Sequence, residues 1–107
     1  MEIEEVINNN NLTFLTGYVI CVSGYSTDER LLLKGMVELC GGIYMEDMES
    51  KNVSFLLSKG LSSEKARHAK RWGVPVLSHQ WLFDSISERH FISINHYILS
   101  TDNSFFN

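Results

Sequence analysis

The sequence predicts an α/β fold in which helices cover both faces of a mostly parallel sheet. Segments with the pattern of strands and helices alternate in the order β-α-β-β-α-β-α, and such alternation is typical of parallel sheets. Residues 18–42 contain the clearest part of this pattern: a strand, a tight turn, a capped helix and a glycine stop. We interpret this stretch as the first half of a β-α-β unit around which the rest of the chain is organised.

The first strand and the first helix are strongly encoded. Residues 18–22 are consecutive apolar residues rich in β-branched side chains, as in a strand buried on both faces. Ser26 and Glu29 have the spacing of a capping box, which begins a helix. Gly41 and Gly42 are expected to end it, because glycine accepts the left-handed conformation needed there. Between these ends, apolar residues recur at helical spacing: Leu32, Leu33, Met36, Val37, Leu39 and Cys40.

Three further segments predict strands. Residues 43–45 are long enough only for a minor strand, and residues 53–57 (VSFLL) form the next clear one. Residues 74–77 predict the last strand of the sheet. Because Pro75 lacks an amide donor, this strand is expected at an edge.

Two further helices are predicted. Residues 64–71 follow Ser62 and Ser63, either of which can cap the helix, and their composition is polar nearly all round. Ser78 is expected to cap the last helix, residues 79–89. One stripe of that helix is mostly apolar and consists of Trp81, Leu82, Ser85 and Ile86.

The chain is expected to form one domain. Residues 12–99 contain all the predicted elements, and residues 91–99 are expected to pack back on them as an extended tail. The asparagine run that ends residues 1–11 indicates a flexible leader, and residues 100–107 are expected to form a flexible tail.

Composition narrows the class of protein. The 107 residues are 44% hydrophobic and 21% charged, which is ordinary for a soluble globular domain. The formal charge of −4 argues against a domain that grips nucleic acid through its whole surface. Cys21 and Cys40 are too few for a disulfide framework and indicate a reducing compartment. With no long apolar run and an acidic N-terminus, the chain is expected to be soluble and intracellular.

Five motifs occur in order across roughly residues 14–99. They are Val22-Ser23-Gly24, Leu39-Cys40-Gly41-Gly42, Val53-Ser54-Phe55-Leu56-Leu57, Ser63-Glu64-Lys65 with Ala69 and Trp72-Gly73-Val74-Pro75-Val76, and Ser78-His79-Gln80-Trp81-Leu82-Phe83-Asp84-Ser85-Ile86. Together they resemble the BRCT domain family, the phosphoprotein-binding modules of DNA-damage and checkpoint proteins. The glycine pair and the Trp-Leu segment look most like the scaffold proteins that contain many BRCT copies.

This resemblance implies a BRCT-like three-layer sandwich. Its four-stranded parallel sheet would have the first and third helices on one face and the second helix on the other. The chain departs from the family at two points. Ser54-Phe55 stands where Thr-His is usual, which we expect to change only local hydrogen bonding. The last helix ends without the glycine often found there.

The positions of three residues in the predicted elements indicate a candidate anion site. In open parallel sheets, ligands gather beyond the carboxyl ends of the strands, near helix N-termini. At such an end, the Ser23 hydroxyl can donate to a phosphate oxygen, and Gly24 lets its backbone N–H approach closely. Lys65 lies in the first turn of a helix, where the macrodipole disfavours a cation by roughly 0.3–1 kcal/mol. An anion between the lysine and the helix end would make that position useful.

The resemblance implies the same three residues. BRCT modules that bind phosphoserine or phosphothreonine use a serine or threonine, the glycine after it and a lysine, and Ser23, Gly24 and Lys65 match these positions. Each residue also has an ordinary interpretation, Ser23 as a hydroxyl bonded to its own backbone and Lys65 as a solvated helix lysine. A second basic group is either a solvated face or a rim that meets acidic residues beside a phosphosite or a DNA end: Arg67, Lys70 and Arg71.

The sequence therefore predicts a non-catalytic interaction module, nuclear by family resemblance, that docks a phosphorylated Ser/Thr motif of a DNA-repair or checkpoint partner. No cofactor is expected, and the histidines and cysteines show no metal-ligand spacing. One alternative is a phosphate-independent scaffold that pairs with another BRCT domain. Another is binding of a DNA end through its 5′ phosphate, which the net charge disfavours. An enzyme is poorly supported, because Ser23-Gly24-Tyr25 carries one glycine where nucleotide-binding loops need several.

Overall fold

The computed structural model describes residues 12–48 and 52–100. Along these residues the secondary structure follows the order expected from the sequence, β-α-β-β-α-β-α. The elements are β1 (Val19–Ser23), α2 (Thr27–Leu39), β2 (Ile43–Tyr44), β3 (Phe55–Ser58), α3 (Glu64–Trp72), β4 (Val76–Leu77) and α4 (Gln80–Glu88).

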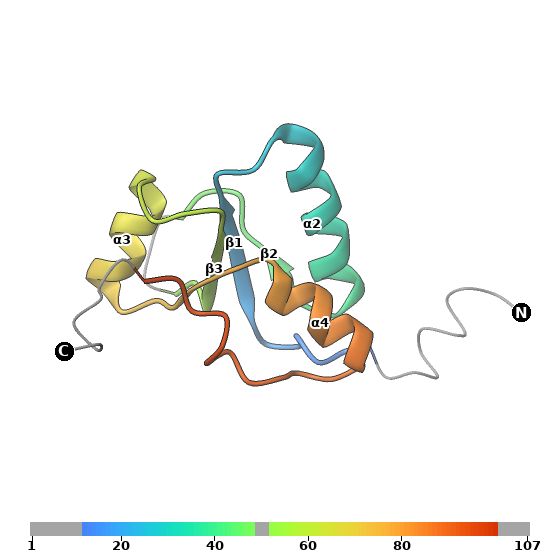
Figure 1. Ribbon diagram of the computed structural model, residues 1–107. Helices are drawn as coiled ribbons and strands as arrows, with labels where there is room; N and C mark the ends of the chain where they lie inside the picture. The colour runs from blue at the N-terminus through green and yellow to red at the C-terminus, as the bar shows by residue number, and fades with distance from the viewer. Residues whose placement is uncertain (1–11, 49–51, 101–107) are drawn as a thin grey trace, which may run out of the picture.

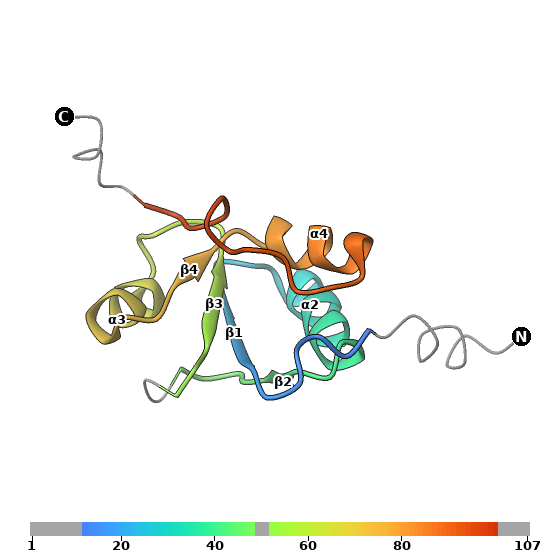
Figure 2. The same ribbon diagram turned by 90° about the horizontal axis from the view of Figure 1, so that it is seen from below.

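The strands form one parallel sheet in the order β2-β1-β3-β4. β1 and β3 lie at its centre, where Ile20 pairs with Phe55 and Ser23 pairs with Ser58. Helices α2 and α4 cover one face of the sheet and α3 covers the other (Figures 1 and 2). The predicted fold class and the predicted division of the helices between the faces are confirmed.

Each face of the sheet has its own core, because successive residues of a strand point to opposite sides. Ile20 and Val22 belong to the larger cluster under α2 and α4. Cys21, between them in the chain, belongs to the cluster under α3. Trp81 of α4 is fully buried in the larger cluster, and its indole N–H donates to the carbonyl oxygen of Ile92 at 2.9 Å. The continuous apolar run of β1 thus reflects burial on both faces.

The two ends of α2 agree with the sequence. The Ser26 hydroxyl accepts from the Glu29 amide at 3.2 Å, and the Glu29 carboxylate accepts from the Ser26 amide at 2.8 Å, which completes the capping box. Gly41 follows the helix with a φ of 84°. A Cβ at Gly42 would lie 3.0 Å from the side chains of Leu15 and Val37. The glycine pair therefore meets two needs, a left-handed turn and close packing.

The observed ends of the other two helices differ in detail from the predicted ends. Ser63, rather than Ser62, caps α3 by accepting from the Ala66 amide at 3.0 Å. Helix α4 covers Gln80–Glu88 instead of residues 79–89, and its N-cap is His79, whose side chain makes no capping bond, rather than Ser78. The Ser78 hydroxyl still accepts from the Gln80 amide at 3.1 Å. At the end of α4, Arg89 adopts the left-handed conformation with a φ of 63°. An arginine thus takes the position where the family often has glycine, at some cost in backbone strain.

The bounds of all four strands differ from the predicted ones. β1 covers Val19–Ser23 instead of residues 18–22, and β2 covers Ile43–Tyr44 instead of residues 43–45. β3 covers Phe55–Ser58 instead of residues 53–57, and the residue before it, Ser54, bonds to the start of β1. The Ser54 hydroxyl accepts from the Val19 amide at 2.9 Å, and the Ser54 amide donates to the Val19 carbonyl at 2.7 Å. β4 is shorter than residues 74–77, because the Val74 amide donates back to the last turn of α3. It lies at the sheet edge, as Pro75 predicted.

The segment after α4 packs back on the domain, as expected. Leu77 and Ile98 form an antiparallel bridge, and the Leu99 amide donates to the carbonyl oxygen of Val76 at 2.8 Å. The Tyr97 hydroxyl donates to the carboxylate of Asp84 in α4 at 2.6 Å. The open edge of β4 is thereby covered by the chain's own backbone.

The predicted leader, residues 1–11, lies outside the described residues, and so do residues 101–107 of the predicted tail. Within the part of the chain that the structure describes, none of the helices combines the length and apolar character needed to cross a membrane.

Candidate functional site

The carboxyl end of β1 lies against the first turn of α3, and two serines join them. Ser23 is the last residue of β1, is 8% exposed, and donates its hydroxyl proton to the Ser63 hydroxyl at 2.7 Å. Ser63 also accepts from the Ala66 amide as the N-cap of α3. A hydroxyl has one donor and two acceptor positions. The proton of Ser63 therefore remains for a further acceptor, and Ser23 is satisfied by Ser63 rather than by its own backbone.

Lys65 folds its side chain back toward the same strand end. Its Nζ donates to the carbonyl oxygen of Val22 at 3.1 Å and to that of Glu46 at 2.7 Å. Burial raises the pKa of the Cys21 thiol, and the Lys65 ammonium partly offsets this rise, which agrees with an ammonium on the α3 side of β1. An ammonium group has three N–H donors. Lys65 is therefore not a freely solvated lysine, and it keeps one donor for an anion.

Gly24 supplies the third group. It is exposed, with a φ of 86°, a conformation that other residues adopt only under strain. Within residues 12–48 and 52–100, its amide N–H has no hydrogen-bond acceptor. A Cβ at this position would lie 3.5 Å from the Cβ of Lys59, an ordinary contact. The backbone conformation, and not crowding, is what requires glycine here.

A cation that the sequence analysis missed lies beside Gly24. The Lys59 amide donates to the carbonyl oxygen of Ser23 at 3.3 Å, which extends the pairing of β1 with β3. The Lys59 ammonium forms an ion pair with Glu29 at 2.9 Å and lies 5.5 Å from the centre of the Tyr25 ring. Only the register of β3 brings Lys59 here. This register pairs Ser23 with Ser58, and no signal in the sequence gave it.

The predicted basic rim lies apart from Lys65. Arg67, Lys70 and Arg71 are exposed, and Arg67 donates to the carbonyl oxygen of Ser62 at 2.7 Å. Arg67 and Lys70 line a groove of about 640 Å³ between α3, β4 and residues 98–100. Lys65 instead contacts the β1 and β2 side of α3. The structure therefore places Lys65 on one flank of α3, and Arg67 and Lys70 on another.

Metal ligation has no support in the described residues. Among them, no group of three or more histidine, cysteine, aspartate or glutamate side chains is arranged to hold a metal ion.

The Asp84 carboxylate accepts hydrogen bonds from Tyr97 at 2.6 Å and from Gln80 at 2.8 Å. The bond from Tyr97 is the main cause of the lowered pKa of this carboxyl. This carboxylate thus serves the packing of the C-terminal segment.

The ionisation of Glu29 is expected to make the stability of the domain depend on pH. The hydrogen bond from the Ser26 amide, helped by Lys59, lowers the pKa of Glu29 from 4.5 to about 2. A carboxyl whose pKa is lower in the folded state stabilises the fold above its unfolded pKa, and this contribution disappears as the pH falls through the folded pKa. We therefore expect Glu29→Gln to have a lower melting temperature than the wild type above pH 5, with the difference shrinking between pH 4.5 and pH 2.

The control is Glu38→Gln, which changes an exposed glutamate in the last turn of the same helix. Thermal melts of the three proteins from pH 7 to pH 2 measure the effect. A Glu29→Gln deficit that stays constant across this range would contradict the assignment.

Comparison with known proteins points to one family. A family model described as a twin BRCT domain matches residues 18–81. BRCT-containing protein 1 of Schizosaccharomyces pombe is 29% identical over 72 residues, which cover 67% of this chain and 8% of that protein. The chain therefore spans only a small part of this relative's length.

Solved structures agree with the fold. The first two BRCT domains of Rad4, a protein of S. pombe, in complex with a Crb2 phosphopeptide superpose with a TM-score of 0.77 at 24% identity, over 82% of this chain and 49% of that one. The BRCT domain of the human DNA repair protein REV1 gives a TM-score of 0.66 at 27% identity, over 83% of this chain and 90% of that one.

Proposed function

This chain belongs to the BRCT domain family, and from that premise we propose that it binds a phosphorylated serine or threonine of a partner protein through Ser23, Gly24 and Lys65. The observation that supports the proposal is that donors near the end of β1 keep capacity for a further acceptor. The Gly24 amide and one N–H of Lys65 have donor capacity for an oxyanion, and so does the Ser63 hydroxyl, which Ser23 holds in place by donating to it.

The expected strength of binding follows from these groups. Hydrogen bonds to a charged group contribute roughly 1.5–3 kcal/mol each. Three such bonds, less the cost of association, support a dissociation constant on the order of micromolar. A single domain of this kind is thus suited to reversible docking, or to use beside other binding sites on the same protein.

The class of partner is proposed from the relatives. Rad4 has been solved with phosphopeptides of Crb2 and Mdb1, and REV1 is a DNA repair protein. We extend this to the present chain as a non-catalytic module of DNA-damage repair or checkpoint signalling that acts in the nucleus. Phosphorylation of the partner would then control the interaction, because a phosphate supplies the charge and the acceptor oxygens that the site lacks.

A library of peptides with a fixed phosphoserine or phosphothreonine and degenerate flanks tests the proposal, alongside the same library without phosphate. We expect the full chain to retain phosphorylated peptides and to release unphosphorylated ones. Equal retention of both libraries would overturn the proposal and favour a phosphate-independent scaffold. Preferential binding of duplex DNA with 5′-phosphate ends, falling steeply with salt, would favour the DNA-end alternative.

A further inference from the structure

Lysine residues approach the end of β1 from both neighbouring strands. β1 lies between β2 and β3 in the sheet. On the β2 side, the Lys65 ammonium donates to the carbonyl oxygen of Glu46, which follows β2. On the β3 side, Lys59 follows the last residue of β3, and its amide donates to the carbonyl oxygen of Ser23 at 3.3 Å. The end of β1 thus has a lysine on each side, although the resemblance to BRCT domains assigns only Lys65 to a phosphate site.

The Lys59 ammonium is held by contacts that are easily exchanged. Its Nζ lies 2.9 Å from a carboxylate oxygen of Glu29 and 5.5 Å from the centre of the Tyr25 ring. The side chains of Lys59 and Glu29 are 49% and 44% exposed, and ion pairs at such exposed positions contribute little to stability. A phosphate group carries more negative charge and more acceptor oxygens than a carboxylate. It can therefore replace Glu29 as the partner of Lys59.

The side chain of Lys59 starts beside an unused donor of the site. A Cβ at Gly24 would lie 3.5 Å from the Cβ of Lys59, and the Gly24 amide has no hydrogen-bond acceptor within residues 12–48 and 52–100. The backbone of Lys59 is fixed by its hydrogen bond to Ser23, whereas its four-carbon stem is flexible. The ammonium can thus turn from Glu29 to an anion at Gly24 without a change in the backbone.

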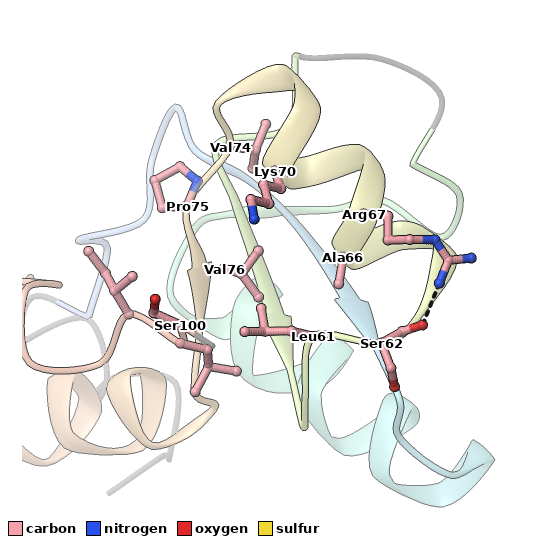
Figure 3. A pocket seen from close by; sticks show the side chains of 11 residues that line it. Leu61, Ser62, Ala66, Arg67, Lys70, Val74, Pro75, Val76 and Ser100 are labelled. Carbon is pink, nitrogen blue, oxygen red and sulfur yellow. Dashed lines mark hydrogen bonds between the residues drawn. The ribbon is translucent and has the colours of Figure 1, made fainter. Parts of the chain in front are cut away.

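The other cations of α3 are directed away from this place. Arg67 and Lys70 line the groove between α3, β4 and residues 98–100. In Figure 3 the side chain of Lys70 reaches toward Val76. The guanidinium of Arg67 turns to the carbonyl oxygen of Ser62, to which it donates at 2.7 Å. The second lysine near the end of β1 therefore comes from the end of β3 and not from α3.

We propose that Lys59 is a further phosphate-binding residue, which pairs with Glu29 in the free domain and with the phosphate of a bound peptide. The inference rests on the proposed function and adds to it a residue outside the set of Ser23, Gly24 and Lys65. Lys59 and Lys65 then hold the phosphate from the two sides of β1, and Glu29 competes with it. Glu29 thus stabilises the free domain through its capping box but weakens binding, a trade-off between stability and function.

Titrations of the full chain with a phosphopeptide selected from the library test this role. Lys59→Met keeps most of the aliphatic stem and is expected to weaken binding about fivefold. This effect is smaller than that expected for Lys65→Met, because Lys59 is more exposed and gives up an existing partner. Lys34→Met, on the exposed face of α2, is the control and is expected to bind like the wild type. Equal affinities of Lys59→Met and Lys34→Met would overturn the proposal.

Glu29→Gln gives a second test with the opposite sign. It removes the competing anion and is expected to strengthen binding about threefold at pH 7, although it lowers the melting temperature. A merely structural role of Glu29 would move affinity and stability in the same direction. Glu38→Gln, which removes an exposed carboxylate from the last turn of the same helix, is expected to bind like the wild type. Unchanged or weaker binding by Glu29→Gln would overturn the proposal.

The same peptide without its phosphate separates this inference from the proposed function. If the wild type prefers the phosphorylated form, and Lys65→Met loses affinity while Lys59→Met does not, the role of Lys59 is wrong and the phosphate site stands. If the wild type binds both forms equally, the proposed function is wrong, and this inference with it.

Discussion

Replacing Lys65 by methionine is expected to reduce the affinity for a phosphopeptide at least tenfold without unfolding the domain. The loss of one charge-assisted hydrogen bond, roughly 1.5–3 kcal/mol, corresponds to about a 10- to 150-fold change. Methionine keeps most of the side chain's length, so the packing of the aliphatic stem is largely preserved. Isothermal titration with a phosphopeptide from the library measures the effect.

Lys34→Met is the matched control, since Lys34 is exposed on α2. Its affinity is expected to equal that of the wild type. Lys65→Arg adds a second comparison, because it keeps the charge in a different geometry and is expected to lose only part of the affinity. Near-UV circular dichroism and melting temperature establish that all variants are folded. A Lys65→Met protein that titrates like the wild type would remove Lys65 from the site.

Trp81→Ala is expected to have the largest effect on stability. Trp81 is fully buried, and its ring lies 5.5 Å from that of Phe55 and 5.1 Å from that of Phe91, measured between centroids. Truncating a buried tryptophan costs about 3–5 kcal/mol. Small domains are stable by about 5–15 kcal/mol in total, so the variant should lose a large part of this stability. The change also leaves the carbonyl of Ile92 without its indole donor.

The chain provides a control of the same residue type. Trp72, at the end of α3, is only partly buried and contacts His68, with 5.3 Å between ring centroids. Trp72→Ala is expected to lower stability far less. Urea denaturation followed by far-UV circular dichroism compares both variants with the wild type. Similar midpoints for the two variants would mean that burial of Trp81 does not dominate the core.

The sequence alone was sufficient for the order of the elements and for the ends of α2 and α3. Local chemistry explains this success, because the capping box at Ser26 and the left-handed turns at Gly41 and Gly73 depend only on neighbouring residues. The end of α4 was harder to predict from the sequence. Arg89 has a low preference for the left-handed conformation, and it adopts this conformation where the packed C-terminal segment follows.

Contacts distant in sequence could not be predicted without the register of the sheet. The hydrogen bond between Ser23 and Ser63 spans 40 residues. The placement of Lys59 beside Gly24 depends on the register in which Ser23 of β1 pairs with Ser58 of β3. The groove could be predicted even less, since it joins α3 to residues 98–100, where the sequence predicts only the end of a packing segment and the start of a flexible tail. The periodicity of apolar residues predicts which face of a helix or strand is buried, but it does not predict the grooves that form between elements.

The antiparallel bridge between Leu77 and Ile98 also affects the solubility of the domain. Strand addition between molecules needs a run of unpaired backbone groups, and here the Ser78 amide and the Val76 carbonyl already bond within the chain. At the other edge β2 offers only two residues, too short a template for aggregation. A polypeptide cut before Ile94 would lose this protection together with one wall of the groove. It is therefore expected to precipitate more readily than the full chain.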